Sequence, residues 1–443
     1  MGKCNAESQI TFLNLLTKWL KQMNNNIKKI FTSVCLLAAS FISTAQIIPI
    51  TLDSCYALSK TNYPLVQQYE LIAKTKEYTL ENISKGFLPQ LNINGQATYQ
   101  SDVTQLPKTI PGVPVLSKDQ YKIYAEVNQP IYDGGVIEEQ KKLQEANTLV
   151  DEQKLEVELY KLKDRINQLF FGILLIEEQL KQNALMKNDI QLGLNKTNAA
   201  IANGTALKSS ADVLKADLLK ANQQTIELRS NRKAFMDMLG LLINRPLDEN
   251  TVLIKPLGLI PSQEIKRPEL LVFDYQHKLL DAQNNLLTAR NRPRLSFFVQ
   301  GGLGKPAFNI LSNSFDPFYI GGLRLSFPLT GYYTLKNDRA LINISRKNID
   351  VQKETFLFNT RFNVKQQNAV IIKLQEILKT DDEIIPLRAN IKKTSLAQLE
   401  FGVINSSDYL RNVNAEDNAK QNKILHEIQL LMAEYNERNT VGE

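Results

Sequence analysis

The chain has 443 residues, of which 43% are hydrophobic and 22% are charged, and its formal net charge is +7. That length and composition can bury a substantial core and do not by themselves indicate a membrane protein. Residues 1–45 hold five lysines and one glutamate, so their removal would lower the net charge to about +3, which gives no reason to expect a nucleic-acid partner. Of the three cysteines only Cys55 lies beyond residue 45, so the remaining chain forms no internal disulfide.

The N-terminal residues have the pattern of a secretory signal. Over residues 23–45, a basic segment with two lysines is followed by an apolar stretch of about 13 residues and then by small residues. Such a stretch is too short to span a bilayer; a buried N-terminal helix is the alternative. We expect residues 23–45 to be a signal peptide and residues 1–22 to be an over-extended reading frame, with translation starting at Met23 rather than Met1.

Four segments alternate between apolar and polar residues in the pattern of a β-strand: 91–99, 121–128, 295–300 and 321–327. In each segment the odd-numbered residues are apolar, aromatic or glycine, and the even-numbered ones are mostly polar. A strand of about ten residues crosses a bilayer when it is tilted. A soluble antiparallel sheet would show the same alternation, so the pattern alone leaves both open.

Aromatic residues at the strand ends favour membrane strands, because aromatic side chains form girdles at the two membrane–water interfaces. These residues are Tyr99, Tyr121, Tyr132, Phe318 and Tyr319. Loops that carry proline or glycine are expected between the paired strands, over residues 106–116 and 304–317.

The rest of the chain is predicted to be helical. Residues 135–203 contain no proline, and their apolar residues recur in alternating steps of four and three, as in a coiled coil: Leu155, Leu159, Leu162, Ile166, Leu169, Ile173, Ile176 and Leu180. A helix of 69 residues is about 100 Å long at 1.5 Å per residue. A second helix of 69 residues is expected over residues 333–401.

Shorter helices are expected beside the long ones, at residues 54–88, 208–242, about 265–292 and 408–440. Each long helix is expected to end at a sharp turn, at Gly204 or Gly402, because glycine permits a positive φ there. Serine or aspartate residues are expected to cap the helix that follows each turn.

The chain contains a tandem repeat. The same landmarks recur in both halves: Pro64, Pro89, Pro130 and Gly204, then Pro268, Pro293, Pro328 and Gly402. The first interval is 25 residues and the last is 74 residues in both halves. A unit near 200 residues is too long for a solenoid repeat, so each copy is expected to be half of one structure. We assign residues 46–245 to the first copy and residues 246–443, beginning with an equatorial linker, to the second.

Four strands cannot close a barrel, and an open sheet edge in hydrocarbon leaves backbone groups unpaired at several kcal/mol each. If the strands enter a membrane, the chain must therefore form an oligomer, with eight strands from two copies or twelve from three.

In order and spacing these segments resemble the TolC family of outer-membrane efflux proteins over nearly all of residues 50–440. The motifs that carry the resemblance are the strand openings 88–91 and 292–295, the strand endings 128–135 and 325–329, and the helix turns 203–214 and 401–410. The resemblance implies a mainly α fold with membrane β-structure. Long coiled-coil α-helical hairpins and four transmembrane β-strands per chain would complete a 12-stranded barrel and an α-barrel tunnel as a homotrimer, with a mixed equatorial region near residues 243–262.

The resemblance also implies a function and a location. The chain would be the exit duct of a tripartite efflux or type I secretion system in the outer membrane of a Gram-negative bacterium. Its partners would be itself, outer-membrane lipid, a periplasmic adaptor (membrane fusion) protein and an inner-membrane pump of the RND or ABC type. The rival interpretation is a secreted soluble coiled-coil scaffold.

The resemblance places the periplasmic gate just after the helix turns, at Asp408 and, in the first copy, at Asp212. A second acid of the family would fall on Arg411, so this chain departs from the pattern there, and Lys215 lies one turn after Asp212. Three copies of Arg411 beside three of Asp408 would form ion pairs rather than a purely anionic ring. The alternative is that both aspartates are N-caps or first-turn acids that favour the helix dipole.

Two further sets of site residues are expected. The tips that would dock the adaptor are Gly204, Thr205, Ala206, Gly402 and Val403, although small residues also suit any tight turn. The polar residues that would face the barrel lumen are Asn92, Asn94, Gln96, Lys122, Glu126 and Arg324.

No catalytic site, cofactor or metal is predicted, and we do not expect an enzyme. The only histidines, His277 and His426, lack metal-ligand spacing. The glycine-rich segment 301–306 has valine at position 299, where a phosphate-binding loop begins with glycine, and Pro306 where that loop has serine or threonine.

Overall fold

The computed structural model describes residues 49–104, 114–258, 264–309 and 311–443. The predicted signal peptide (23–45) and the over-extended start (1–22) lie outside the described residues, as do most of the predicted loop 106–116 and part of the equatorial region. Ile50–Glu249 and Leu253–Glu443 form one compact unit that contains all the described helices and strands.

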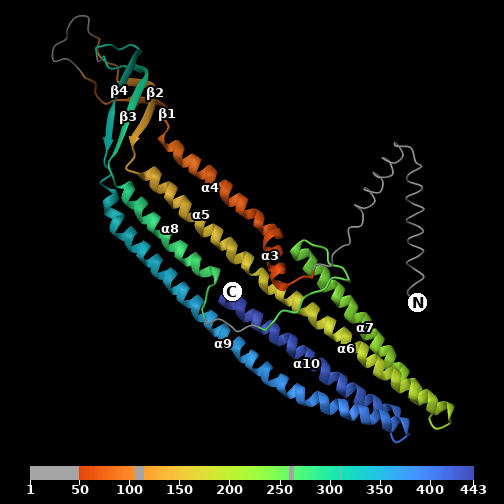
Figure 1. The fold of residues 1–443 in the computed structure, drawn as a ribbon. Helices are drawn as coiled ribbons and strands as arrows, with labels where there is room; N and C mark the ends of the chain where they lie inside the picture. Colours follow the sequence, from red (N-terminus) through yellow and green to blue (C-terminus); the bar gives the residue numbers. More distant parts are fainter. Residues whose placement is uncertain (1–48, 105–113, 259–263, 310) are drawn as a thin grey trace, which may run out of the picture. The chain divides into compact units, whose positions relative to one another are not determined.

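The described strands form one antiparallel sheet in the order β1-β2-β3-β4 (Figure 1). The strands are β1 (Gln90–Tyr99), β2 (Asp119–Tyr132), β3 (Arg294–Lys305) and β4 (Asp316–Ser326). All four predicted strands are present, and β2, β3 and β4 extend beyond the predicted ranges. The outer edges of β1 and β4 pair with no strand of the described residues.

The register gives the sheet two chemically different faces. Leu91 lies opposite Val127, Val127 opposite Val299, and Val299 opposite Gly321. Odd-numbered residues therefore share one face, the odd face, and even-numbered residues share the other, the even face. Only the inner end of β2 departs from this rule, because an irregularity between Pro130 and Tyr132 places Tyr132 opposite Leu295.

The described helices are α3 (Leu52–Asn62), α4 (Gln68–Ser84), α5 (Val136–Tyr160), α6 (Leu162–Ala202), α7 (Lys208–Ile243), α8 (Pro268–Arg290), α9 (Gly331–Glu400) and α10 (Ser406–Val441), with 3-10 turns at Pro64–Gln67 and Lys85–Phe87. The predicted second long helix is confirmed as α9, which has 70 residues and continues through Pro386. None of the helices in the described ranges is both long and apolar enough to cross a bilayer.

Two predicted helices are each divided in the structure. The predicted helix 54–88 separates into α3 and α4 because Tyr63, with ψ of 133°, is extended, as expected for a residue that precedes proline. The predicted helix 135–203 separates into α5 and α6 at Lys161, which adopts a turn. Its start is fixed by Asp133, whose carboxylate accepts from the backbone N–H groups of Gly135 and Ile137 at 2.9 and 2.6 Å.

The helices pack side by side in an order that matches the order of the strands. Next to the sheet, α4 packs on α5, α5 on α8 and α8 on α9; farther away, α7 packs on α6, α6 on α10 and α10 on α9 (Figure 1). Because α4 leads into β1 and β4 leads into α9, each edge of the sheet continues into an edge of the helical layer. One edge contains β1, α4 and α7, and the other contains β4 and α9.

Two buried cores stabilise the helices. The larger core lies where α3, α6, α7 and α10 meet, and it includes Phe170, Phe171 and Leu239, none of which is exposed. The smaller core lies near the helix turns and is formed by α6, α7, α9 and α10: Ile190, Leu194, Ala211, Leu214, Leu399, Tyr409, Leu410 and Val413.

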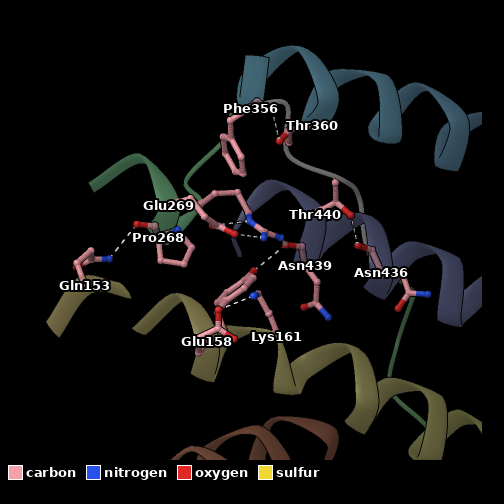
Figure 2. A network of polar contacts seen from close by, with 12 residues as sticks. Gln153, Glu158, Lys161, Pro268, Glu269, Phe356, Thr360, Asn436, Asn439 and Thr440 are labelled. Carbon is pink, nitrogen blue, oxygen red and sulfur yellow. Dashed lines mark hydrogen bonds and ion pairs between the residues drawn. The ribbon is translucent and has the colours of Figure 1, made fainter. Parts of the chain in front are cut away.

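A polar junction holds the C-terminal end of α10 against the start of α8 and the break between α5 and α6 (Figure 2). Arg267 forms an ion pair with Glu269 and donates to the carbonyl oxygen of Asn439 at 3.1 Å. The Tyr160 hydroxyl donates to the same carbonyl at 2.8 Å, and its ring lies 4.9 Å from the Arg267 guanidinium. The Asn439 carbonyl in the last turn of α10 thus accepts from two side-chain donors.

Candidate functional site

The six residues predicted to face the lumen lie together on the even face of the sheet. Asn92 lies opposite Glu126, and Gln96 lies opposite Lys122. Arg324 lies opposite Ser296 on the neighbouring strand. The period-two pattern therefore brings Asn92 and Arg324, which are 232 positions apart, onto one polar surface.

Glu126 is the centre of a hydrogen-bonded group on the even face. One carboxylate oxygen accepts from Arg324 at 3.1 Å, and the other accepts from Gln300 at 2.9 Å. The Arg324 guanidinium also lies 4.5 Å from the centre of the Phe298 ring. The contacts satisfy both oxygens of a carboxylate that is mostly covered by its neighbours.

Lys122 is held by aromatic rings. Its ammonium lies 4.4 Å from the centre of the Phe318 ring and 5.3 Å from that of Tyr124, in the range of cation–π attraction. Phe318 was predicted to belong to an exposed aromatic girdle, and that prediction is wrong. The register of β4 places Phe318 on the even face. The ring of Phe308 covers it there, so that Phe318 is only 7% exposed.

The odd face of the sheet exposes large apolar side chains. Ile93 is 76% exposed and Tyr319 is 84% exposed. The other large exposed residues of this face are Leu91, Tyr99, Tyr121, Ile123, Val127, Phe297, Val299, Leu303, Leu323 and Leu325. A continuous apolar surface of this kind marks a site that contacts another apolar phase or another protein.

The two helix turns have the predicted glycine geometry. Gly204 has a φ of 74° and Gly402 a φ of 71°, the left-handed region in which glycine is strain-free. The N–H of Thr205 donates to the carbonyl of Ala200 at 2.9 Å, and that of Val403 donates to Gln398 at 2.8 Å. With the bonds from the two glycines, these contacts complete the same C-terminal motif in both copies.

The predicted serine and aspartate caps are not present. Asn405 caps α10 by accepting from the N–H of Asp408 at 2.9 Å, so Asp408 is a first-turn acid. Leu207 precedes α7 without any side-chain cap, and Asp212 lies beyond the first turn of that helix. Sequence proximity alone does not specify which of several adjacent polar residues adopts the extended backbone of a cap.

The four predicted gate residues form ion pairs within their own helices. Arg411 donates to Asp408 at 2.9 Å, and Lys215 lies 3.8 Å from Asp212. Arg411 also borders a groove between α7 and α10, together with Val213 and Asn414. The structure therefore places both pairs on the two helices that face each other at the tips, but joins neither pair to the other.

The tips present an uncovered surface. A side-chain carbon at Gly204 or Gly402 would meet no atom within 4 Å. Glycine is therefore required there by the positive φ and not by a lack of space. Thr205 and Val403 are exposed, and Ala206 is half-buried. Three large apolar neighbours are also exposed at 70% or more: Leu207, Phe401 and Val403.

Sequence reasoning missed a buried charge cluster that joins the two helical hairpins. Lys392 of α9 lies 2.7 Å from Asp189 of α6 and 2.5 Å from Glu416 of α10. Lys420 lies 2.8 Å from Glu416, and the Tyr409 hydroxyl donates to the Asp189 carbonyl at 2.9 Å. The sequence carried no local signal for this cluster, because its members come from three separate helices of the chain.

Burial and pairing act in opposite directions on this charge cluster. Burial favours the uncharged forms, but the partners outweigh it, so the pKa of Lys392 is raised and that of Glu416 is lowered. Asp417, one residue on, differs because burial dominates and raises its pKa, although Gln182 donates a hydrogen bond to it at 2.9 Å. The lysine and Glu416 thus stay charged while linking three helices.

No group of three or more histidine, cysteine, aspartate or glutamate residues in the described chain is arranged to hold a metal. His277 lies 3.1 Å from Asp350, and His426 lies 2.6 Å from Asp381. The glycine-rich segment ends β3 and leads to β4 rather than to a helix, which does not fit a phosphate-binding loop.

No model of a known protein family matches the sequence, and no curated protein matches it. Solved structures do match. The transmembrane channel protein CusC aligns with a TM-score of 0.64 and 11% identity over 89% of this chain and 92% of that one. The outer membrane protein VceC of Vibrio cholerae aligns with a TM-score of 0.61 and 11% identity, over 88% of this chain and 96% of that one. The open-state MtrE outer membrane channel of Neisseria gonorrhoeae aligns with a TM-score of 0.60 and 14% identity over 88% of each chain. The likeness confirms the predicted TolC-type fold of long helical hairpins joined to a four-stranded sheet.

Proposed function

We propose that the chain is the outer-membrane exit duct of a tripartite efflux or type I secretion system in a Gram-negative bacterium. It acts as a homotrimer and conducts small molecules, or proteins, passively. One observation carries the proposal above all: the sheet has an exposed apolar odd face and a polar even face, and its two edges pair with no other strand in the described part of the chain. Such a sheet suits a lipid-facing wall around a wet lumen once further copies close it.

The edges of the helical layer support closure by copies of the same chain. α9 exposes a stripe of apolar residues along one side, the α9 stripe: Ile344, Val351, Phe358, Phe362, Leu387 and Ile391. The opposite edge exposes pairs of apolar residues seven positions apart, Leu71 and Tyr78 on α4 and Leu219 and Ile226 on α7. Stripes of this spacing pack against each other in coiled coils, so one chain's α9 edge pairs with the next chain's α4 and α7 edge.

The trimer follows from the four strands, because three copies supply the twelve strands that the fold's resemblance implies. In this arrangement residues 46–245 and 246–443 are two structural repeats, each supplying one β-hairpin and one helical hairpin. The tips of both helical hairpins point away from the barrel, into the periplasm. An adaptor protein docks there on Gly204, Thr205, Ala206, Gly402 and Val403, beside the exposed Leu207 and Phe401.

The gate lies at the same tips. Asp408 and Arg411, with Asp212 and Lys215, line the entrance, and the buried charge cluster around Lys392 holds the hairpins together in the closed state. Opening separates α10 from α6 and α7, while an inner-membrane pump of the RND or ABC type supplies the energy.

Fractionation and electrophoresis test the proposal first. We expect the protein in the outer-membrane fraction as a heat-modifiable trimer, with conductance in planar bilayers. A soluble monomer or a periplasmic protein without conductance would instead support the secreted scaffold. Phe358→Asp should abolish the trimer because it places a charge in the α9 stripe, whereas Phe401→Asp, at a tip residue that is 81% exposed, should not.

The gate is tested separately by the conductance and ion selectivity of Asp408→Ala and Arg411→Ala. Breaking the 2.9 Å ion pair should change both quantities, and Arg411→Ala, which leaves an unpaired acid, should favour cations. Lys74→Ala is the matched control, because Lys74 forms an exposed pair with Glu70 on α4, away from the tips. Unchanged values in both gate variants would remove these residues from the gate.

A further inference from the structure

In the loop between β3 and β4, residues 306–308 turn back over the even face of the sheet. Gly304, the last even-numbered residue of β3, is buried by this turn. A side-chain carbon at Gly304 would lie 3.1 Å from the carbonyl oxygen of Pro306 and 3.4 Å from the Cα of Ala307. The backbone of the loop therefore crosses the sheet beside Lys122, which lies opposite Gly304.

Phe308 continues this path along the even face. Its ring packs edge-on against Phe318, with 5.0 Å between the ring centres, and lies 5.5 Å from the Lys122 ammonium. Lys122 forms no ion pair with a carboxylate of the described residues, so the aromatic rings are its main partners. A desolvated cation–π contact contributes up to about 2 kcal/mol, which is enough to hold a loop in one position.

A second phenylalanine of the same loop lies on the opposite face. Phe315 approaches the ring of the odd-numbered Tyr121, with 6.2 Å between ring centres. Asn313 accepts a hydrogen bond from the N–H of Ser117 at 3.1 Å and ties the loop to the start of β2. The loop thus straddles the end of the sheet, with Phe308 on the polar face and Phe315 on the apolar face.

We propose that Phe308 forms a size-limiting constriction at the outer mouth of the duct and that Lys122 is the positioning residue that holds it there. This inference rests on the proposed function, in which the even face lines the lumen. The strand ends that carry this loop are the ends remote from the helices, so the constriction lies at the exit and is separate from the gate at the helix tips. Phe308 is 55% exposed, so about half of the ring is free to narrow the lumen, once from each copy.

Labelling from outside the cell tests the exit without depending on the gate. A cysteine introduced by Asn92→Cys lies on the even face, nearer the helices than Lys122, and the native Cys55 is fully buried. Intact cells are treated with maleimides of increasing size. In the single variant Asn92→Cys, we expect only small reagents to label the cysteine. In the double variant that also carries Phe308→Ala, larger reagents should react several-fold faster. Phe315→Ala is the matched control and should change nothing.

Lys122 is tested in the same background. Lys122→Gln should admit the larger reagents because it removes the charge that the rings attract, and Lys122→Arg should exclude them as the native residue does. Equal size limits in the native, Phe308→Ala and Phe315→Ala proteins would overturn the constriction, although the duct itself would stand. Failure of even the smallest reagent to label any variant would show that the even face lines no outward-open lumen, and the proposed function would fail with it.

Discussion

Gly193 of α6 provides the space for the ring of Tyr409 of α10. A side-chain carbon at position 193 would overlap Cε1 of Tyr409 and lie 2.9 Å from its Cδ1. Tyr409 is only 1% exposed at the centre of the smaller core, and its hydroxyl reaches the carbonyl of Asp189 one turn earlier on α6. The two hairpins can therefore approach closely only because residue 193 lacks a side chain.

Gly193→Ala should loosen the contact between the hairpins. Forcing a methyl group into a packed core costs about 1–3 kcal/mol, and thermal unfolding of the purified protein measures this loss of stability. We expect a lower Tm for Gly193→Ala. Gly95→Ala is the control, because a side-chain carbon there would meet nothing within 4 Å. An unchanged Tm for both variants would contradict the assignment of Gly193 to a close contact.

Lys392→Met should destabilise the hairpins more than the loss of one contact would suggest. Glu416 is 3% exposed, and removing one partner of a buried ion pair costs about 3–5 kcal/mol when the other charge is left unpaired. Lys420 still pairs with Glu416, so we expect a loss near the lower end of that range. Adding Glu416→Gln should restore part of the loss. The measurement is a double-mutant cycle in denaturant; additive effects of the two substitutions would show that the residues do not interact.

Asp417→Asn should stabilise the folded chain at neutral pH. Burial raises the pKa of Asp417 above its ordinary value of 3.8, so the folded state holds this proton more tightly than the unfolded state does. Ionisation of Asp417 therefore costs stability as the pH rises above about 3.8, and asparagine removes that cost while it still accepts from Gln182. Unfolding should be compared at pH 7 and pH 3; a gain that is equal at both pH values would refute this explanation.

Gly402→Val should shorten or distort the second helix turn. A φ of 71° costs a residue with a side-chain carbon about 1–2 kcal/mol, and asparagine tolerates this conformation better than a β-branched residue does. We expect thermal unfolding to show that the protein with glycine is the most stable, that with asparagine is intermediate and that with valine is the least stable. If the tip docks an adaptor as proposed, cross-linking to it should fall in the same order. Equal stabilities for valine and glycine would exclude a conformational role.

Much of the fold follows from the sequence because its signals are local. Alternation with period two assigns Asn92 and Glu126 to one face of the sheet, since successive side chains of any strand point to opposite faces. Gly204 and Gly402 mark the helix ends because a positive φ is a property of a single residue. The heptad from Leu155 to Leu180 indicates a long buried seam.

Other features depend on which surfaces meet in space. The sequence does not show the helix break at Lys161, where the ends of α8 and α10 meet the long helix, because Lys161 itself is compatible with a helix. Nor does it show that Phe318 is covered by Phe308, because strand periodicity ignores loops. The contact of Lys392 with Asp189 joins residues 203 positions apart.

The sequence by itself therefore determined most of the elements, the two faces of the sheet and the turns, because each follows from backbone geometry over a few residues. Only the tertiary structure decided how the hairpins are joined, through Gly193, Tyr409 and Lys392, and where the β3–β4 loop lies. Those contacts arise from the packing of helix and strand surfaces that are distant in the chain. Close packing selects among many sequence-compatible partners by shape and charge.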